Sequence, residues 1–290
     1  MKKNVANILY HICVVVLSAG IALSLPNIIK YLAQKVLMYW SFLENENVFL
    51  VATEILAAII LIVLVNVVVR DWRLRKLARF AKDAGLAGVA RATALLTRRR
   101  LKKMKAEQGF GRSVMILNST GFQTFTDSEG DLHQVLRNCR EAKIMLLNPL
   151  MDGVTARVKS LADPNTTPEI FREQITRSID FLKGLRALQK NVRLKLYRDA
   201  PLLKLAILGD YLCLQHYPAG LNVRDMPEYV FKHEQHGGLF NLFYQYFVSR
   251  WFDLKIPEYD LDTDELIYRD KAGNEVRREK FGEVVMESGH

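Results

Sequence analysis

Four polar residues near the ends of predicted strands have the side chains needed to bind an anion such as a phosphate group. Lys204 and Arg198 are cationic donors, while Ser119 and Thr120 provide hydroxyl and backbone N–H groups directly after an apolar run. Such residues bind phosphate when the fold brings them together, and they are ordinary solvated surface positions when it does not. We therefore treat the four as candidate ligand-binding residues.

The other reactive side chains give a weaker signal. His216 lies on the neighbouring run and could act as a nucleophile or bind phosphate, although an isolated histidine is more often a hydrogen-bonded core residue. Cys13, Cys139 and Cys213 are scattered and lack metal-ligand spacing, which is typical of small buried hydrophobic residues in a reducing compartment. We expect no metal ion and no cofactor.

Three further polar residues lie in apolar segments long enough to cross a membrane. Val48–Val69 has 22 residues and one charge, Glu54, and as a helix it reaches about 33 Å at ~1.5 Å per residue. It also contains Asn66, and the charge-free segment Val5–Leu25 contains His11. Since a charge at membrane depth costs about 2.5 to 3.5 kcal/mol, we expect these side chains to line a water-filled pore. Alternatively, Glu54 is protonated or reaches the outer interface.

The charges flanking the two apolar segments predict their topology. Lys2 and Lys3 precede the first segment, and a basic run from Arg70 follows the second, so the positive-inside rule predicts a helical hairpin over residues 1–69 with both chain termini in the cytoplasm. A cleaved signal peptide usually has a shorter apolar region, so we expect the first helix to be retained. One hairpin cannot enclose a pore, so a pore requires a homo-oligomer, for which we assume a tetramer.

The positive charge of the chain is concentrated just after the second apolar segment. Residues 70–107 hold 13 Lys or Arg against three acids, a local balance of +10 that equals the net charge of the whole chain. We predict a basic juxtamembrane helix over residues 70–108 that contacts anionic lipid, with a phosphate-bearing ligand or nucleic acid as the alternative partner. The basic residues near its end are Arg98, Arg99, Arg100, Lys102 and Lys103.

Strands and helices alternate over residues 109–256, which predicts a cytosolic α/β domain with a mixed sheet. The whole chain thus combines a helical membrane part with a mixed α+β or α/β fold. The expected strands are Ser113–Asn118, Ala142–Leu150 and three runs between Asn191 and Tyr217; the expected helices are Leu132–Glu141, Val154–Leu161, Pro168–Gln189 and a mostly buried aromatic helix, Gly238–Asp253. Residues 257–290 form a mixed-charge tail with a hairpin around Ala272-Gly273-Asn274.

The runs ILNSTGF, KIMLLNPL, NVRLKLYRDAPLLKLAILGDYLCLQHYPAG and FYQYFVSRWFD resemble the halves of a phospholipase D superfamily domain over about Gly109–Asp253. The resemblance implies the motif His-x-Lys-x4-Asp, in which the His attacks phosphorus and the Lys binds the phosphate. With Lys204 as the motif Lys, Leu202 replaces the His and Gly209 replaces the Asp, with Asp210 one position late. Because leucine cannot form a phosphohistidine, we expect phosphate binding without catalysis.

The combination of two membrane spans, a basic coupling helix and a degenerate enzyme domain resembles the membrane effectors of bacterial anti-phage systems, including the Hailong type. In these systems a nucleotidyltransferase product controls an oligomeric channel, which single-stranded DNA holds closed in some cases. The resemblance implies a multi-pass protein of the bacterial inner membrane, gated by a nucleotide or a single-stranded oligonucleotide, with a cognate nucleotidyltransferase as partner.

Two other functions fit the same sequence. One is a membrane-anchored phosphodiesterase, nuclease or phospholipid-modifying enzyme that uses His216 or an altered motif. The other is an interaction scaffold that holds a partner protein at the membrane. We favour the gated effector because the motif has lost its nucleophile while Glu54 is retained in a membrane span.

Overall fold

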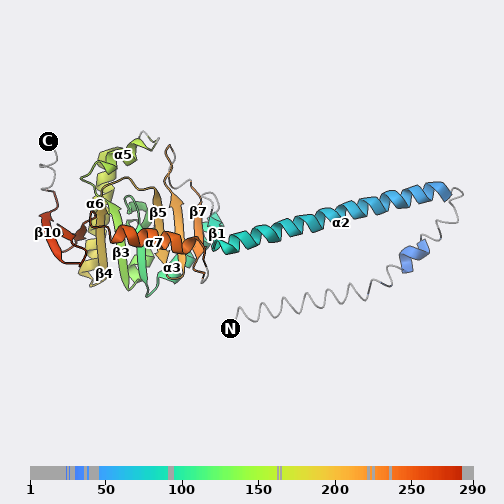
Figure 1. The fold of residues 1–290 in the computed structure, drawn as a ribbon, viewed down its shortest axis with the longest axis horizontal. Coiled ribbons are helices and arrows are strands. Elements are labelled where there is room, and N and C mark those ends of the chain that lie inside the picture. Colours follow the sequence, from blue (N-terminus) through green and yellow to red (C-terminus); the bar gives the residue numbers. More distant parts are fainter. Residues whose placement is uncertain are drawn as a thin grey trace. The chain divides into compact units, whose positions relative to one another are not determined.

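The structure is a computed structural model that describes residues 24, 26, 30–35, 38, 46–90, 95–161, 163, 165–220, 223, 226–234 and 237–282, without the side chains of residues 46–50, 95 and 96 (Figure 1). The chain divides into two compact units, Met1–Arg75 and Lys76–His290. The second unit is a mixed α/β domain with one large mixed sheet, as the sequence predicts.

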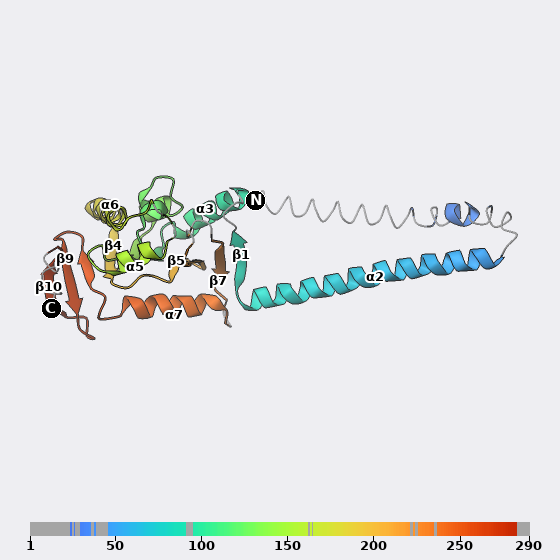
Figure 2. The same cartoon turned by 90° about the horizontal axis from the view of Figure 1, so that it is seen from above.

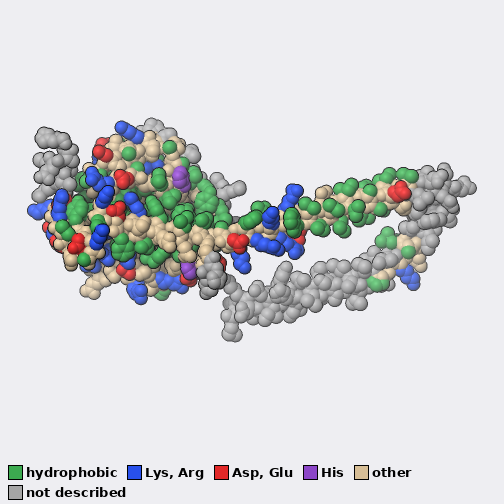
Figure 3. Space-filling view, viewed as in Figure 1, with side chains coloured by type: hydrophobic (Ala, Val, Ile, Leu, Met, Phe, Trp, Pro, Cys, Tyr) green, Lys and Arg blue, Asp and Glu red, His purple; other side chains and the backbone are tan. Residues whose placement is uncertain are grey.

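The long helix α2 (Glu46–Asp83) begins in the first unit and ends in the second. Its segment Val51–Asp83 is long and apolar enough to cross a membrane, and none of the span is buried in the protein. Figure 3 shows apolar side chains along this helix, followed by a group of Lys and Arg side chains. The first apolar segment, including His11, lies outside the described residues except for Ser24.

The prediction of one basic helix over residues 70–108 is wrong. Helix α2 ends at Asp83, strand β1 (Leu86–Ala90) follows, and a second helix, α3 (Leu95–Gly109), carries the later basic residues. The break occurs at Gly85, whose φ of 69° is readily adopted only by glycine. The carbonyl oxygen of Gly85 accepts a hydrogen bond from the N–H of Lys232 at 2.8 Å, which ties the end of α2 to the sheet.

Among the described residues, ten strands form one sheet in the order β1-β7-β6-β5-β2-β3-β4-β8-β9-β10. Strands β2, β3 and β4 are parallel to one another, and the other neighbours are antiparallel. After β1 the strands are β2 (Ser113–Leu117), β3 (Glu141–Leu147), β4 (Asn191–Tyr197), β5 (Leu203–Leu208), β6 (Tyr211–His216), β7 (Glu228–Lys232), β8 (Glu258–Asp260), β9 (Glu265–Arg269) and β10 (Glu275–Lys280). The predicted strands of residues 113–217 are confirmed.

Helices cover both faces of this sheet (Figure 2). Helices α3, α4 (His133–Asn138) and α6 (Pro168–Ala187) lie on one side, and α7 (Leu239–Trp251) lies on the other. A π-helical turn, η1 (Phe122–Thr126), and a short helix, α5 (Gly153–Lys159), complete the domain.

Two of the predicted helices differ from expectation. The helix expected over Leu132–Glu141 spans only His133–Asn138, because Glu141 already begins β3. Helix α7 is only partly buried: Phe240, Phe247 and Trp251 pack inward, whereas Leu242 is 59% exposed. Its aromatic residues occur on more than one face of the helix, so a single sheet surface cannot cover them all.

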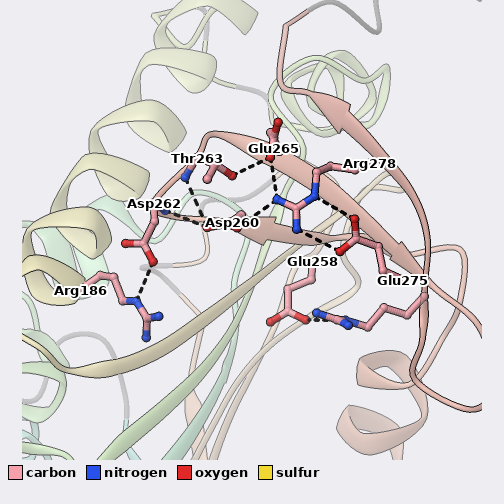
Figure 4. Close-up of polar contacts among 9 residues, drawn as sticks. Arg186, Glu258, Asp260, Asp262, Thr263, Glu265, Glu275 and Arg278 are labelled. Atoms are coloured by element: carbon pink, nitrogen blue, oxygen red, sulfur yellow. Dashed lines mark hydrogen bonds and ion pairs between the residues drawn. The ribbon is translucent and has the colours of Figure 1, made fainter.

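The predicted C-terminal hairpin is confirmed and extends the sheet beyond β4. Strand β8 pairs with β4, and the β9–β10 hairpin continues from it. Ion pairs hold these strands together (Figure 4): Arg278 contacts Glu275 and Glu265, and Glu258 contacts Arg193 at 2.8 Å. Paired charges on exposed strands such as β10 keep a sheet edge soluble.

The packing around α5 allows a stability prediction. A side-chain carbon on Gly153 would collide with the backbone oxygen of Arg198, whereas one on Gly184 in α6 would meet nothing within 4 Å. We expect Gly153→Ala to lower the free energy of unfolding by about 2 kcal/mol or more, and Gly184→Ala to raise it by about 0.5 kcal/mol. Urea midpoints of the full-length protein in detergent, read by pulse proteolysis, measure both. Equal midpoints would show that α5 does not pack tightly on the end of β4.

Candidate anion-binding site

A cavity of about 490 Å³ opens between α3 and the sheet. Its described walls come from β1, α3, the segment between β2 and α4, α5, α6 and strands β5 to β7. The volume lies within the range of roughly 300 to 1,000 Å³ that is typical of small-molecule sites. The basic segment that follows α2 therefore forms one wall of a ligand-sized cavity.

Cationic side chains outnumber carboxylates in the described lining. The cations are Arg98, Arg99, Lys102, Lys105, Arg157 and Lys204, and the carboxylates are Asp127, Glu129, Asp131 and Glu228. Lys102 lies 3.7 Å from Glu129, and Lys105 is paired with two of the other acids. Among the described residues, the remaining four cations make no ion pair, so the cavity carries excess positive charge that favours an anionic ligand.

Lys105 is the best-anchored of these cations. Its side chain is only 1% exposed, and its ammonium group donates to Asp131 Oδ2 and, at 2.6 Å, to Glu228 Oε1. Glu228 belongs to β7 and is the register partner of Ala90 in β1, while Asp131 precedes α4. One buried ammonium group thus joins α3 to the sheet and to the segment after η1. We call Lys105, Asp131 and Glu228 the ion triad.

The surroundings of the ion triad shift two pKa values. Burial alone would lower the pKa of Lys105, but the negative charges of Asp131 and Glu228 outweigh it and raise the pKa well above its usual value. Burial alone would raise the pKa of Asp131, but the positive charges of Lys105 and Lys204, together with the hydrogen bond from Lys105, outweigh it and lower the pKa to about 2. Both groups are therefore charged at neutral pH, and each depends on the other.

A network of buried hydroxyl and amide groups shapes another wall of the cavity. The N–H and the hydroxyl of Ser119 donate to the Tyr217 hydroxyl at 3.1 and 3.2 Å, and that hydroxyl donates to Asn118 Oδ1 at 2.9 Å. The Tyr197 hydroxyl donates to the Asn118 carbonyl oxygen at 2.7 Å. The neighbouring Thr120 hydroxyl makes no hydrogen bond to any described residue and is available to a ligand. These bonds hold the segment after β2 in a fixed conformation.

The cavity brings together only some of the predicted ligand-binding residues. Ser119, Thr120 and Lys204 all line it. Arg198 instead lines a second cavity of about 720 Å³, near the end of α7. His216 ends β6 with an exposed side chain and lies in neither lining.

The predicted basic residues and the predicted pore-lining residues differ in whether they line the cavity. Of the basic group on α3, Arg98, Arg99 and Lys102 line the cavity, whereas Arg100 and Lys103 do not. Glu54 and Asn66 lie on α2 with exposed side chains.

The positions of the phospholipase D motif do not assemble around Lys204. Leu202 is 67% exposed, and Gly209 and Asp210 form the turn between β5 and β6, where Asp210 faces Arg112 at 3.6 Å. Among the described lining residues of the cavity there is no histidine. The described lining therefore contains cationic and hydroxyl groups but no histidine of the expected motif.

Sequence reasoning missed Lys105, Asp131, Glu228, Arg157 and Tyr217 as site residues. For Lys105 a signal existed, because Leu101, Lys105 and Gly109 recur at helical spacing and all face the domain. The other four residues come from elements far apart in the sequence, and no local pattern marks them.

Comparisons with known proteins add little to this geometry. No protein-family model and no curated protein matches the chain. One similar solved structure is that of TrmBL2, an archaeal chromatin protein described as showing a novel mode of DNA binding, with 14% identity and a TM-score of 0.34. The match covers 65% of this chain and 63% of that chain. Similarity at this level supports no conclusion about fold or function.

The ion triad gives the second prediction. Lys105→Met leaves two partly buried carboxylates without the ammonium group that pairs them, so we expect the free energy of unfolding to fall by about 3 kcal/mol or more. The matched control is Lys103→Met on the same helix, whose side chain is 79% exposed and whose loss costs about 0.5 kcal/mol or less. Urea denaturation of both full-length variants measures the difference. Similar losses in the two variants would contradict a structural role for the triad.

Proposed function

We propose that this protein is a homo-oligomeric membrane effector whose cytosolic domain controls an ion-conducting pore by binding a nucleotide or a single-stranded oligonucleotide. The observation that carries the proposal is the cavity with four cations that form no ion pair with any described residue, one wall of which is the segment that follows α2. A receptor built directly onto the end of a membrane-spanning helix is well placed to move that helix.

The ligand class follows from the lining. Arginine and lysine with nearby hydroxyl groups are the usual partners of phosphate oxygens. The lining includes Arg157, Lys204 and Thr120. The described residues contain no group of three or more potential metal ligands. These features support binding of a phosphate-bearing ligand more than its chemical conversion.

A continuous path of contacts joins the cavity to α2 within the second unit. The N–H of Leu239 donates to the carbonyl oxygen of Ala84 at 3.0 Å, beside the Gly85 contact already described. Strand β1 then pairs with β7, and Glu228 of β7 binds Lys105 of α3. A ligand that shifts α3 therefore acts on β1 and β7, the strands that hold the end of α2.

In the membrane, we propose that α2 and the Val5–Leu25 segment form the predicted hairpin, with both termini in the cytoplasm, and that copies assemble around a pore. Glu54 and Asn66 are 12 positions apart, which places them about 120° apart around a regular helix. If one narrow face of α2 lines the pore, that face includes only one of the two residues. Glu54 is the stronger candidate because its charge requires water. We propose that the assembly is a tetramer in a bacterial inner membrane. It acts in anti-phage defence together with a nucleotidyltransferase.

Ion flux in liposomes tests this function. Full-length protein is compared before and after treatment with nuclease and high salt, which removes bound nucleic acid. We expect the flux to change with the treatment, and we expect Lys204→Ala to bind a single-stranded oligonucleotide at least about tenfold more weakly, because a charge-assisted contact is lost. The matched control, Lys232→Ala, removes an exposed strand lysine outside the cavity lining.

Each result separates the competing functions. Flux that never responds would remove nucleic-acid gating, and the absence of flux with correctly inserted protein would contradict the pore. Turnover of phosphodiesters that is lost in His216→Ala would favour the enzyme, and a stoichiometric protein partner without flux would favour the scaffold. Normal gating in Glu54→Ala and His11→Ala would remove both residues from the pore.

A further inference from the structure

Arg157 on α5 lines the same cavity and is buried in an unusual way. It is 3% exposed, and no carboxylate of the described residues lies within ion-pair distance. Its Nη1 atom donates to Ser160 Oγ at 2.9 Å and to the Pro218 carbonyl oxygen at 3.4 Å. Its guanidinium carbon lies 4.6 Å from the centre of the Tyr217 ring. The buried Nε atom has no acceptor.

The contrast with Lys105 shows what is missing around Arg157. Both are buried cations on one cavity, but Lys105 has two carboxylate partners and Arg157 has none. A buried guanidinium without an anion is costly, and burial lowers the pKa of Arg157. Arginine nevertheless stays protonated in proteins, so the charge persists and requires an anion from outside the described residues.

The contacts that Arg157 does make fix its orientation. Nη1 is occupied by Ser160 and Pro218, and one face of the guanidinium lies over Tyr217. This leaves the buried Nε without an acceptor among the described residues. A guanidinium group that retains its charge is a strong donor to phosphate oxygens. The cavity already offers the Thr120 hydroxyl and Lys204 as further donors.

We infer that Arg157 is the phosphate-recognising residue of the cavity, its guanidinium group donating to one phosphate of the ligand. The inference rests on the proposed function, because it names the residue that reads the phosphate of the same ligand. The phosphate comes either from a nucleic acid or from the free ion, and the test distinguishes these sources.

The test uses full-length protein in nanodiscs and a fluorescent, random-sequence, 5′-phosphorylated DNA hexamer, with inorganic phosphate as competitor. We expect Arg157→Met to weaken hexamer binding at least tenfold, and Arg157→Lys to restore part of it. The melting temperature of ligand-free Arg157→Met should be no lower than that of wild type, because the variant removes an unpaired buried charge. If Arg157 served only to stabilise the fold, Arg157→Met would instead have a lower melting temperature than wild type.

Arg250→Met is the matched control, because Arg250 also has a buried Nε without an acceptor but lines the second cavity. We expect it to bind the hexamer as wild type does. Binding of inorganic phosphate measured directly by calorimetry, with no affinity for the hexamer, would assign the site to the free ion. Hexamer binding that is weakened by Lys204→Ala but unchanged in Arg157→Met would overturn this inference and leave the proposed function standing. No binding of hexamer or phosphate by wild type would overturn both.

Discussion

The ion triad is the constraint on which the rest of the second unit depends. A single ammonium group, that of Lys105, is 1% exposed and binds carboxylates from two elements that are distant in sequence. Burying an ammonium group is favourable only if its carboxylate partners stay in place, so α3 is fixed against β7 and against the segment before α4. Without this anchor, a helix as basic as α3 has little reason to remain on the domain, because most of its Lys and Arg side chains favour solvent. The triad thus turns a basic juxtamembrane segment into the wall of a cavity.

The cavity is lined by two buried cations, Lys105 and Arg157, whose surroundings differ. Lys105 is neutralised by the protein itself and serves structure, whereas Arg157 has hydrogen bonds and an aromatic neighbour but no anion among the described residues. Proteins keep such an unpaired charge at a stability cost where a ligand completes it. Since β1 follows α2 directly and pairs with the strand that carries Glu228, the cavity wall and the end of α2 share one set of contacts. This shared set of contacts supports the proposed gating.

Much of the fold follows from local sequence, and the site does not. Thr167 caps α6 by accepting a hydrogen bond from the N–H of Ile170, with Pro168 in the first turn, a helix start that depends only on neighbouring residues. The break of the basic helix at Gly85 was missed because the strand that follows gains its stability from β7, about 140 positions later. Nothing in the charge pattern around Lys105 distinguishes it from its basic neighbours, since charge pattern alone cannot show that two acids pair with it. Long-range pairing decides both outcomes, and a single sequence does not contain that information in any local pattern.

Hydrogen exchange on full-length protein in nanodiscs tests the central claim most directly, namely that occupancy of the cavity is transmitted to the end of α2. Deuterium uptake is compared with and without the 5′-phosphorylated DNA hexamer, peptide by peptide. The account predicts slower exchange in α3, in β1 and at the end of α2 near Gly85 when the hexamer is bound, with β9 and β10 unchanged. Slower exchange confined to other parts of the sheet, or no difference around the cavity, would contradict it.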